Sequence, residues 1–194
     1  MRIAEIIIGI IAVILIIMNL LTIPGGSVGV VLLFSFLSFF YYILSFALLN
    51  GIRLRNIFKA DSYKGIRSIQ IILSILTGFA LSIMLLGILF KIEFYPGEKI
   101  MMLYGLIFVG VITIISIILH IINKADTYRR ILIRTAIIGG VGLFFFILPS
   151  NTIIDIKYKE YPELAEAFKK HRENPGDEYY KSKYKEEREK RMEK

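Results

Sequence analysis

The chain has 194 residues, of which 56% are hydrophobic and 21% charged, and its mean hydropathy is +0.65. Soluble domains are less apolar than this. The absence of cysteine excludes disulfides, thiolate metal sites and cysteine nucleophiles. The net charge is +8, and the lysines and arginines lie mainly in connecting segments and in the C-terminal part, so we expect no nucleic-acid partner.

The apolar residues fall in five long blocks, each about the length of a helix that crosses a bilayer core of roughly 30 Å. The first block is too long for the apolar part of a signal peptide and no small-residue cleavage site follows it, so we expect it to be retained. The sequence therefore predicts an all-α, polytopic membrane protein surrounded by the lipid bilayer, with five transmembrane helices arranged as two helical hairpins plus a fifth span. The predicted spans are residues 3–23, 27–49, 68–90, 100–122 and 131–149.

Two connecting segments are strongly basic. The segment before the third block carries Arg53, Arg55, Lys59, Lys64 and Arg67 against Asp61, and the segment before the fifth carries Lys124, Arg129 and Arg130 against Asp126, with Arg134 just inside the next helix. The positive-inside rule places these segments and the N-terminus in the cytoplasm, at a bacterial inner membrane. Five spans then place the tail, residues 150–194, in the periplasm. If the short fifth block were re-entrant, the tail would be cytoplasmic.

Two Pro-Gly turns occupy corresponding places in the first two predicted hairpins. Aligning Pro24-Gly25 with Pro96-Gly97 brings residues 1–49 into register with residues 68–122 at an offset of 72, and Asn19 then aligns with Lys91. Proline fixes φ and glycine accepts the dihedrals that reverse the chain, so this pair suits any tight helical hairpin. The two hairpins are either an internal duplication or two independent uses of one turn.

The second hairpin contains the sequence GILFKIEFYPGEKIMMLYG, which resembles the transmembrane hairpin of the GldL-like family of Bacteroidota, associated with gliding motility and type 9 secretion. The resemblance is limited to about residues 86–115. Tyr95 stands where the family has Trp, and Phe94 where it has His. The matching positions are Gly87, Phe90, Lys91, Ile92, Pro96, Gly97, Met101 and Gly105.

The resemblance implies a hairpin of the inner membrane that works within an envelope complex. In the family, an acidic residue inside the second helix of the hairpin is needed for a proton-driven motor. Val109 occupies the aligned position here, and residues 100–119 contain no Asp or Glu. Since a proton path needs a titratable group at membrane depth, we expect this chain to lack motor chemistry.

Few polar residues lie in or beside the predicted spans. Lys91 is expected to be an interfacial lysine paired with Glu93 or Glu98, or else a residue of an ion path or subunit contact. Asn19 is expected to cap or bridge the first two helices, and His120 to be an interfacial residue rather than a ligand. The candidate helix-contact or functional positions are Asn19, Lys91, Glu93, Pro96, Gly97 and His120.

Small residues within the spans are expected to let helices approach closely and to supply hydrogen bonds between them. Hydroxyls recur at intervals of three, which places each pair on one helical face. A glycine group predicts a close helix crossing in the fifth span. These residues are Ser35 and Ser38, Ser74 and Thr77, Thr113 and Ser116, and Gly139, Gly140 and Gly142.

The tail is densely charged, with twelve Lys or Arg and eleven Asp or Glu in residues 150–194. Pro162 followed by Glu163 predicts the start of a helix, the Asn174-Pro175-Gly176 sequence predicts its end, and residues 177–193 predict a second helix. The tail is expected to be helical or partly disordered and solvated, or to bind a partner.

No catalytic, cofactor-binding or metal-ligand motif is present, and the two histidines are far apart in the sequence. We therefore expect a non-enzymatic protein without a cofactor, acting as a structural or accessory subunit of a bacterial envelope complex, with membrane-protein partners or further copies of itself. The alternative is a small transporter or channel that acts as an oligomer, which predicts polar residues converging in mid-membrane.

Overall fold

The computed structural model describes the backbone of residues 2–192 and the side chains of residues 7–53 and 55–191. Within this range the chain forms eight α-helices and no strand. The helices are α1 (Arg2–Leu20), α2 (Gly26–Leu49), α3 (Ser68–Ile92), α4 (Glu98–Asn123), α5 (Asp126–Ile147), α6 (Ser150–Lys157), α7 (Pro162–Glu173) and α8 (Glu178–Met192). Two 3-10 turns, η1 (Leu54–Asn56) and η2 (Ala60–Tyr63), lie between α2 and α3.

Four helices in the described part of the chain, α2 to α5, are long and apolar enough to cross a membrane. This confirms the prediction of an all-α chain that fits a multi-pass membrane protein. The fifth predicted span is displaced, because α5 begins at Asp126 rather than at residue 131 and ends at Ile147 rather than at residue 149. For the first predicted span, the side chains of residues 3–6 lie outside the described ones, and α1 is apolar over Ile7–Leu20.

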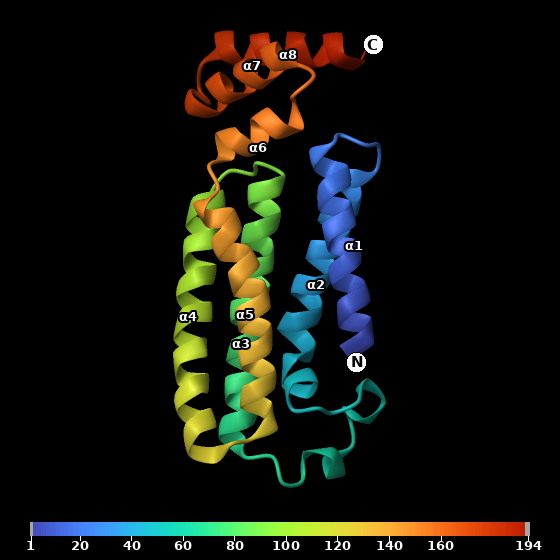
Figure 1. Ribbon diagram of the computed structural model, residues 1–194, viewed down its shortest axis with the longest axis vertical. Coiled ribbons are helices and arrows are strands. Elements are labelled where there is room, and N and C mark those ends of the chain that lie inside the picture. The colour runs from blue at the N-terminus through green and yellow to red at the C-terminus, as the bar shows by residue number, and fades with distance from the viewer. Residues whose placement is uncertain (1, 193–194) are drawn as a thin grey trace. The chain divides into compact units, whose positions relative to one another are not determined.

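The contacts divide the chain into two compact units, residues 30–147 and residues 1–29 with 148–194. In the first of these, α3, α4 and α5 run side by side (Figure 1). Helix α3 is the central element. Of the residues in its 18-residue apolar stretch, 61% are buried, against 22% for the corresponding stretch of α4. The exposed apolar side chains of α4, such as Ile107 and Ile114, are those expected to face lipid.

Glycines allow the three central helices to approach one another closely. A Cβ at Gly105 of α4 would lie 2.9 Å from the Cα of Met84 on α3, and a Cβ at Gly142 of α5 would collide with the Met84 side chain. A Cβ at Gly139 would lie 2.8 Å from Val109 of α4. The predicted close crossing in the fifth span is therefore confirmed for Gly139 and Gly142. The prediction is wrong for Gly140, which is exposed. A Cβ added there would have no other atom within 4 Å.

The predicted hydroxyl contacts between helices form at two positions. The Ser38 and Ser82 hydroxyls lie 2.6 Å apart and join α2 to α3, and Ser74 accepts a hydrogen bond from Asn50 at 3.0 Å. Thr77 and Thr113 instead donate to carbonyls four residues earlier in their own helices. A threonine in a helix has a backbone acceptor within reach whether or not a neighbouring helix offers one, so spacing alone could not separate the two outcomes.

The other hydroxyls expected to make such contacts behave differently. Ser35 is exposed. Ser116 is fully buried, but its Oγ has no hydrogen-bond partner in the part of the chain that the structure describes. Its contribution is therefore its small size at a packed position, rather than a hydrogen bond.

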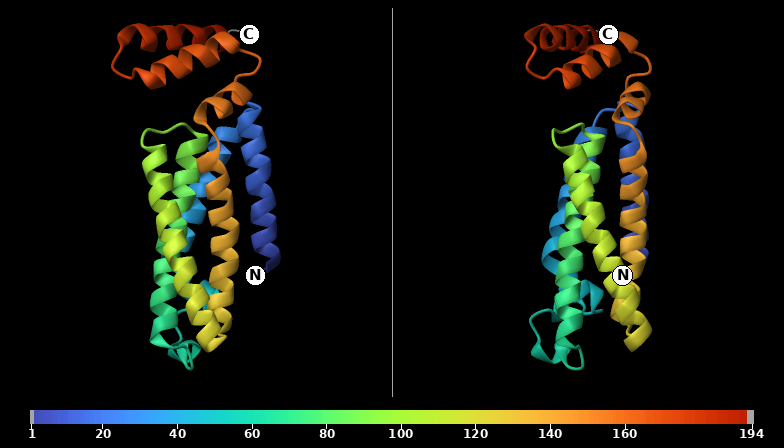
Figure 2. Two further views of the ribbon diagram at one scale, coloured as in Figure 1. Left: turned by 60° about the vertical axis from the view of Figure 1, so that its left-hand side comes forward. Right: turned by 90° about the vertical axis from the view of Figure 1, so that its left-hand side faces the viewer.

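In the second unit, helices α7 and α8 lie against each other as an antiparallel pair (Figure 2). Helix α7 begins at Pro162, and an aromatic cluster joins the two helices. The ring centroids of Phe168 and Tyr184 are 5.0 Å apart, and His171 stacks on Tyr184 at 5.6 Å. The guanidinium of Arg191 lies 5.4 Å from the centre of the Tyr161 ring. The last two residues of the predicted tail, 193 and 194, lie outside the described part.

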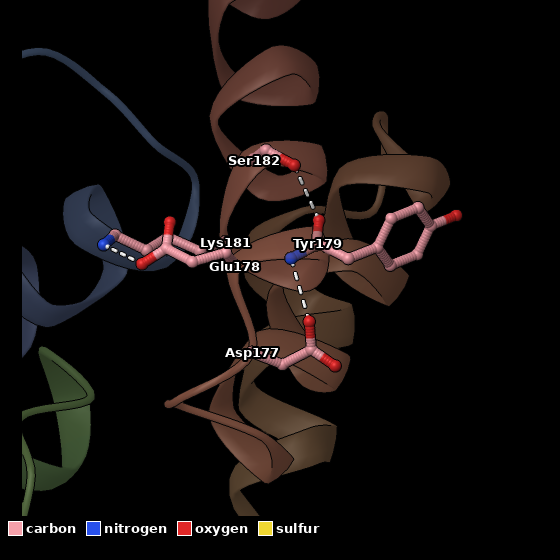
Figure 3. Close-up of polar contacts among 5 residues, drawn as sticks. All are labelled: Asp177, Glu178, Tyr179, Lys181 and Ser182. Carbon is pink, nitrogen blue, oxygen red and sulfur yellow. Dashed lines mark hydrogen bonds and ion pairs between the residues drawn. The ribbon is translucent and has the colours of Figure 1, made fainter.

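Helix α8 begins with a side-chain cap. Asp177 Oδ1 accepts a hydrogen bond from the backbone N–H of Tyr179 at 2.8 Å, which satisfies one of the donors left free at a helix start (Figure 3). Lys181 pairs with Glu178 at 2.8 Å, and Ser182 donates to the Tyr179 carbonyl. Local side-chain contacts thus define the first turn of a helix whose residues are mostly charged.

Candidate functional site

The α3–α4 turn, residues 93–97, contains three of the six candidate positions, Glu93, Pro96 and Gly97. Helix α3 ends at Ile92 and is capped by Glu93, whose backbone N–H donates to the Leu89 carbonyl at 3.0 Å. Phe94 follows with φ of 58°, and the Tyr95 N–H closes the helix end by donating to the Phe90 carbonyl at 2.8 Å. Gly97 has φ of 83°, a conformation that side chains with a Cβ rarely adopt, and α4 begins directly after it.

The α1–α2 turn has the same backbone geometry at the predicted offset of 72. Thr22 has φ of 55°, where Phe94 has 58°, and Gly25 has φ of 86°, where Gly97 has 83°. The hydrogen bond from the Ile23 N–H to the Met18 carbonyl, at 2.9 Å, corresponds to the one from Tyr95 to Phe90. Helix ends also match, since α1 ends at residue 20 and α3 at 92, while α2 begins at 26 and α4 at 98. The proposed register is therefore present in the backbone of both turns.

Lys91 and Glu98 form a buried ion pair across the α3–α4 turn. Lys91 Nζ lies 3.6 Å from Glu98 Oε1, and the two side chains are only 4% and 6% exposed. The turn places a cation in the last turn of α3 and a carboxylate at the start of α4, which is the arrangement that both helix dipoles favour. Of the two partners expected for Lys91, Glu98 is in contact. Burial of both charges also makes the pair sensitive to loss of either partner.

Asn19, which aligns with Lys91, is also buried, and its polar neighbour is a lysine. Its Oδ1 accepts a hydrogen bond from Lys157 Nζ on α6 at 2.7 Å, and Asn19 itself is 2% exposed. The expected role of Asn19 involved only the first two helices. Sequence reasoning missed Lys157, which appeared to be one charge among many in the tail, because no local pattern connects residues 138 positions apart.

The remaining candidates lie in the α3–α4 turn and at the other end of α4. Glu93 is half-buried at the end of α3, and Pro96 and Gly97 are exposed in the turn. His120 is half-buried in the last turn of α4, and its Nδ1 has no hydrogen-bond partner among the described residues. Glu98 and His120 are separated by about 33 Å along one straight helix at 1.5 Å per residue, so they cannot belong to one site.

A second polar cluster, which sequence reasoning missed, surrounds Asn50 at the end of α2. The Asn50 amide donates to the Phe46 carbonyl at 2.7 Å and to Ser74 of α3 at 3.0 Å, and its Oδ1 accepts from Thr127 of α5 at 3.1 Å. One side chain therefore ties together three helices. An Asn-Gly pair such as residues 50–51 marks a turn, and no local pattern connects it with Ser74 or Thr127.

Arginines lie close to this cluster. Arg130 of α5 donates to the Leu49 carbonyl at 3.3 Å, and its guanidinium fills the space beside Gly51 where a Cβ would lie. Arg67 donates to Asn123 at 2.7 Å, which links the start of α3 to the end of α4. Arg134 is 9% exposed and donates back along its helix to the Arg130 carbonyl at 3.2 Å.

Comparisons with protein-family models, with curated proteins and with solved structures found no match to this chain. The structure itself defines the class, since its long apolar helices fit a multi-pass membrane protein. Among the described residues, no group of three or more His, Asp or Glu is placed to hold a metal ion.

Proposed function

We propose that this protein is a non-enzymatic subunit or scaffold of a bacterial envelope complex in the inner membrane, with a second hairpin related to the GldL-like family and without proton-motor chemistry. The main support is the environment of Val109, which stands where the family has its motor acid. Val109 is 5% exposed, and one of its methyl groups lies 2.8 Å from the Cβ position of Gly139. An aliphatic side chain that fills a helix crossing stabilises packing and cannot carry a proton.

The proposal includes five membrane spans, with α1 as the first. The basic segments before α3 and before α5 favour a cytoplasmic position for themselves and for the N-terminus. With an odd number of spans, the tail with α7 and α8 then lies in the periplasm. There its charged surface is available to other components of the envelope.

Affinity purification of the tagged full-length chain tests the proposed role. After cross-linking in native membranes and gentle solubilisation, we expect a companion protein, or further copies of this chain, in constant proportion to the tagged copy. Recovery of the monomer alone, from membranes in which a known complex remains intact, would contradict a subunit role.

Proton flux tests the absence of motor chemistry separately. Vesicles that contain the purified chain should acidify no faster than protein-free vesicles under an imposed membrane potential. A reproducible flux that depends on the protein would overturn this part of the proposal and would favour the transporter or channel alternative.

A further inference from the structure

The segment between α2 and α3 forms a small polar cavity at the basic end of residues 30–147. The cavity has a volume of about 300 Å³, at the lower end of the range for small-molecule sites. Its lining residues are Asn50, Gly51, Ile52, Arg53, Asn56 and Ser62. Asn50 is held by the contacts to three helices described above, so one wall of the cavity is fixed to the helical bundle.

Three side chains of the lining have hydrogen-bonding capacity to spare. In the part of the chain that the structure describes, no hydrogen bond or ion pair engages the side chains of Arg53, Asn56 and Ser62. Guanidinium, amide and hydroxyl groups are the donors that proteins use for phosphate oxygens, and arginine can donate two parallel hydrogen bonds to them.

The electrostatic environment of the cavity is positive. The Arg130 guanidinium lies beside Gly51 of the lining, which adds a second cation near Arg53. The one acid of the segment, Asp61, is paired with Lys64 at 2.7 Å. An anionic group would therefore meet two arginines and no unpaired carboxylate from this segment.

An exposed aromatic residue lies in the same segment. Phe58 stands between η1 and η2 and is 99% exposed, the most exposed of the large apolar side chains in the described part. Arg55 and Lys59 are close to it in the sequence and are exposed as well. An aromatic ring among basic side chains, in the segment that connects two membrane-length helices, is typical of a segment that inserts into the headgroup region.

We propose that this segment is a binding site for the phosphate group of an anionic phospholipid, in which Arg53, Asn56 and Ser62 bind the phosphate and Phe58 inserts beside the acyl chains. Phosphate chemistry alone would also suit free inorganic phosphate. The exposed ring of Phe58 favours the lipid, because free phosphate offers nothing for it to contact. The site does not depend on the function proposed above.

A tryptophan reporter tests the site in the full-length chain. The sequence contains no tryptophan, so Phe58→Trp supplies a single fluorophore at an exposed position. The protein in mild detergent is titrated with brominated phosphatidylglycerol or brominated phosphatidylcholine, and quenching of the tryptophan is measured. The comparison is repeated with Arg53→Gln and, as a matched control, with Lys124→Gln, which removes an equal charge from the exposed basic segment before α5, outside the cavity. Far-UV circular dichroism checks that each variant keeps its helices.

We expect phosphatidylglycerol to quench at lower concentration than phosphatidylcholine, and Arg53→Gln to weaken that effect about five-fold, the contribution of one basic residue near an anionic surface. Lys124→Gln should change it less than two-fold, since Lys124 does not line the cavity. Equal quenching by both lipids, or equal effects of the two substitutions, would overturn a discrete site. Displacement of the lipid by inorganic phosphate at equal concentration would overturn the assignment to a lipid.

Discussion

At the scale of single residues, the Lys91–Glu98 pair places two opposite charges in the buried part of residues 30–147. Both side chains are removed from water at a separation of 3.6 Å, so each charge compensates for the burial of the other. A buried pair adds little compared with apolar residues of the same size, but removal of one partner leaves a buried charge without compensation. Its contribution is therefore best measured through the coupling of the two residues.

We expect Lys91→Met or Glu98→Gln alone to lower the free energy of unfolding by about 3 kcal/mol, and the double substitution to restore most of the loss. The measurement is denaturant or thermal unfolding in detergent micelles. Lys99→Gln is the matched control, because Lys99 is exposed next to Glu98, and a change within about 0.5 kcal/mol is expected for it. Additive effects of the two single substitutions would show that the pair does not act as a unit.

At the scale of helices, close packing depends on glycines that face a neighbour rather than on glycine content. Gly105 and Gly110 both lie on α4, but they meet different environments. A Cβ at Gly105 would lie 2.9 Å from a backbone atom of Met84, whereas a Cβ at Gly110 has no atom within 4 Å. Backbone atoms in a packed helix cannot move aside as the end of a side chain can.

These two glycines provide a matched test of packing. We expect Gly105→Ala to lower the free energy of unfolding by about 1–3 kcal/mol, because it forces α3 and α4 apart. Gly110→Ala should be neutral or stabilising by up to about 1 kcal/mol, because alanine favours the helix and meets no obstacle. Unfolding in detergent measures both, and equal effects would contradict the close approach at Gly105.

The tail helices should respond to acid. The hydrogen bond and the charge of Lys170 hold the pKa of Glu166 below its ordinary value of 4.5, and Lys181 and Lys190 lower the pKa of Glu178 and Glu186 in the same way. A carboxyl group with a lowered pKa in the folded state stabilises that state above the unfolded pKa, and this contribution disappears as the pH falls through the folded value. The helicity of α7 and α8 should therefore be constant from pH 7 to about 5 and should decrease below about pH 4.

Carbon-13 chemical shifts of Cα atoms in selectively labelled full-length protein measure this response residue by residue. Since these carboxyl groups are exposed, we expect a partial loss of helicity rather than unfolding. Glu166→Gln should weaken the acid response of α7, and Glu160→Gln, which removes a carboxyl group between α6 and α7, should leave it unchanged. An unaltered response in Glu166→Gln would show that the Glu166–Lys170 pair has no part in it.

At the scale of the whole molecule, the proposed five-span topology decides which segments meet which compartment. The chain has no cysteine, so single cysteines can report accessibility without removing any native residue of that type. Lys59, Tyr95 and Gly176 are exposed positions in the segment before α3, in the α3–α4 turn and between α7 and α8. They therefore sample both proposed faces and the tail.

We expect a membrane-impermeant maleimide to label Tyr95→Cys and Gly176→Cys in intact spheroplasts, and Lys59→Cys only after permeabilisation. Labelling of Gly176→Cys only after permeabilisation would place the tail in the cytoplasm and contradict five spans. The Tyr95→Cys and Lys59→Cys variants serve as internal standards for the two sides of the membrane.

The sequence by itself determined the long apolar helices and the two Pro-Gly turns, because these depend on local chemistry. It did not predict the start of α5 at Asp126 or the short helix α6. Blocks of apolar residues defined α2 to α5, and Pro-Gly at residues 96–97 defined a turn that places α4 directly after Gly97. The sequence also predicted the register of 72 residues between the two Pro-Gly turns, because the φ preferences of proline and glycine act within a few residues. A pairing of Lys91 with Glu98 could be anticipated for the same reason, as both flank one short turn.

Only the tertiary structure decided which residues meet when they are distant in the sequence. The contacts of Asn50 with Ser74 and Thr127, and of Asn19 with Lys157, join helices whose rotation about their own axes no local pattern reports. The same rotation distinguishes Gly139, which faces Val109, from Gly140, which faces away. Which side of a helix is buried depends on the neighbouring helices. When a helix is apolar on every face, its sequence does not show which face packs against them.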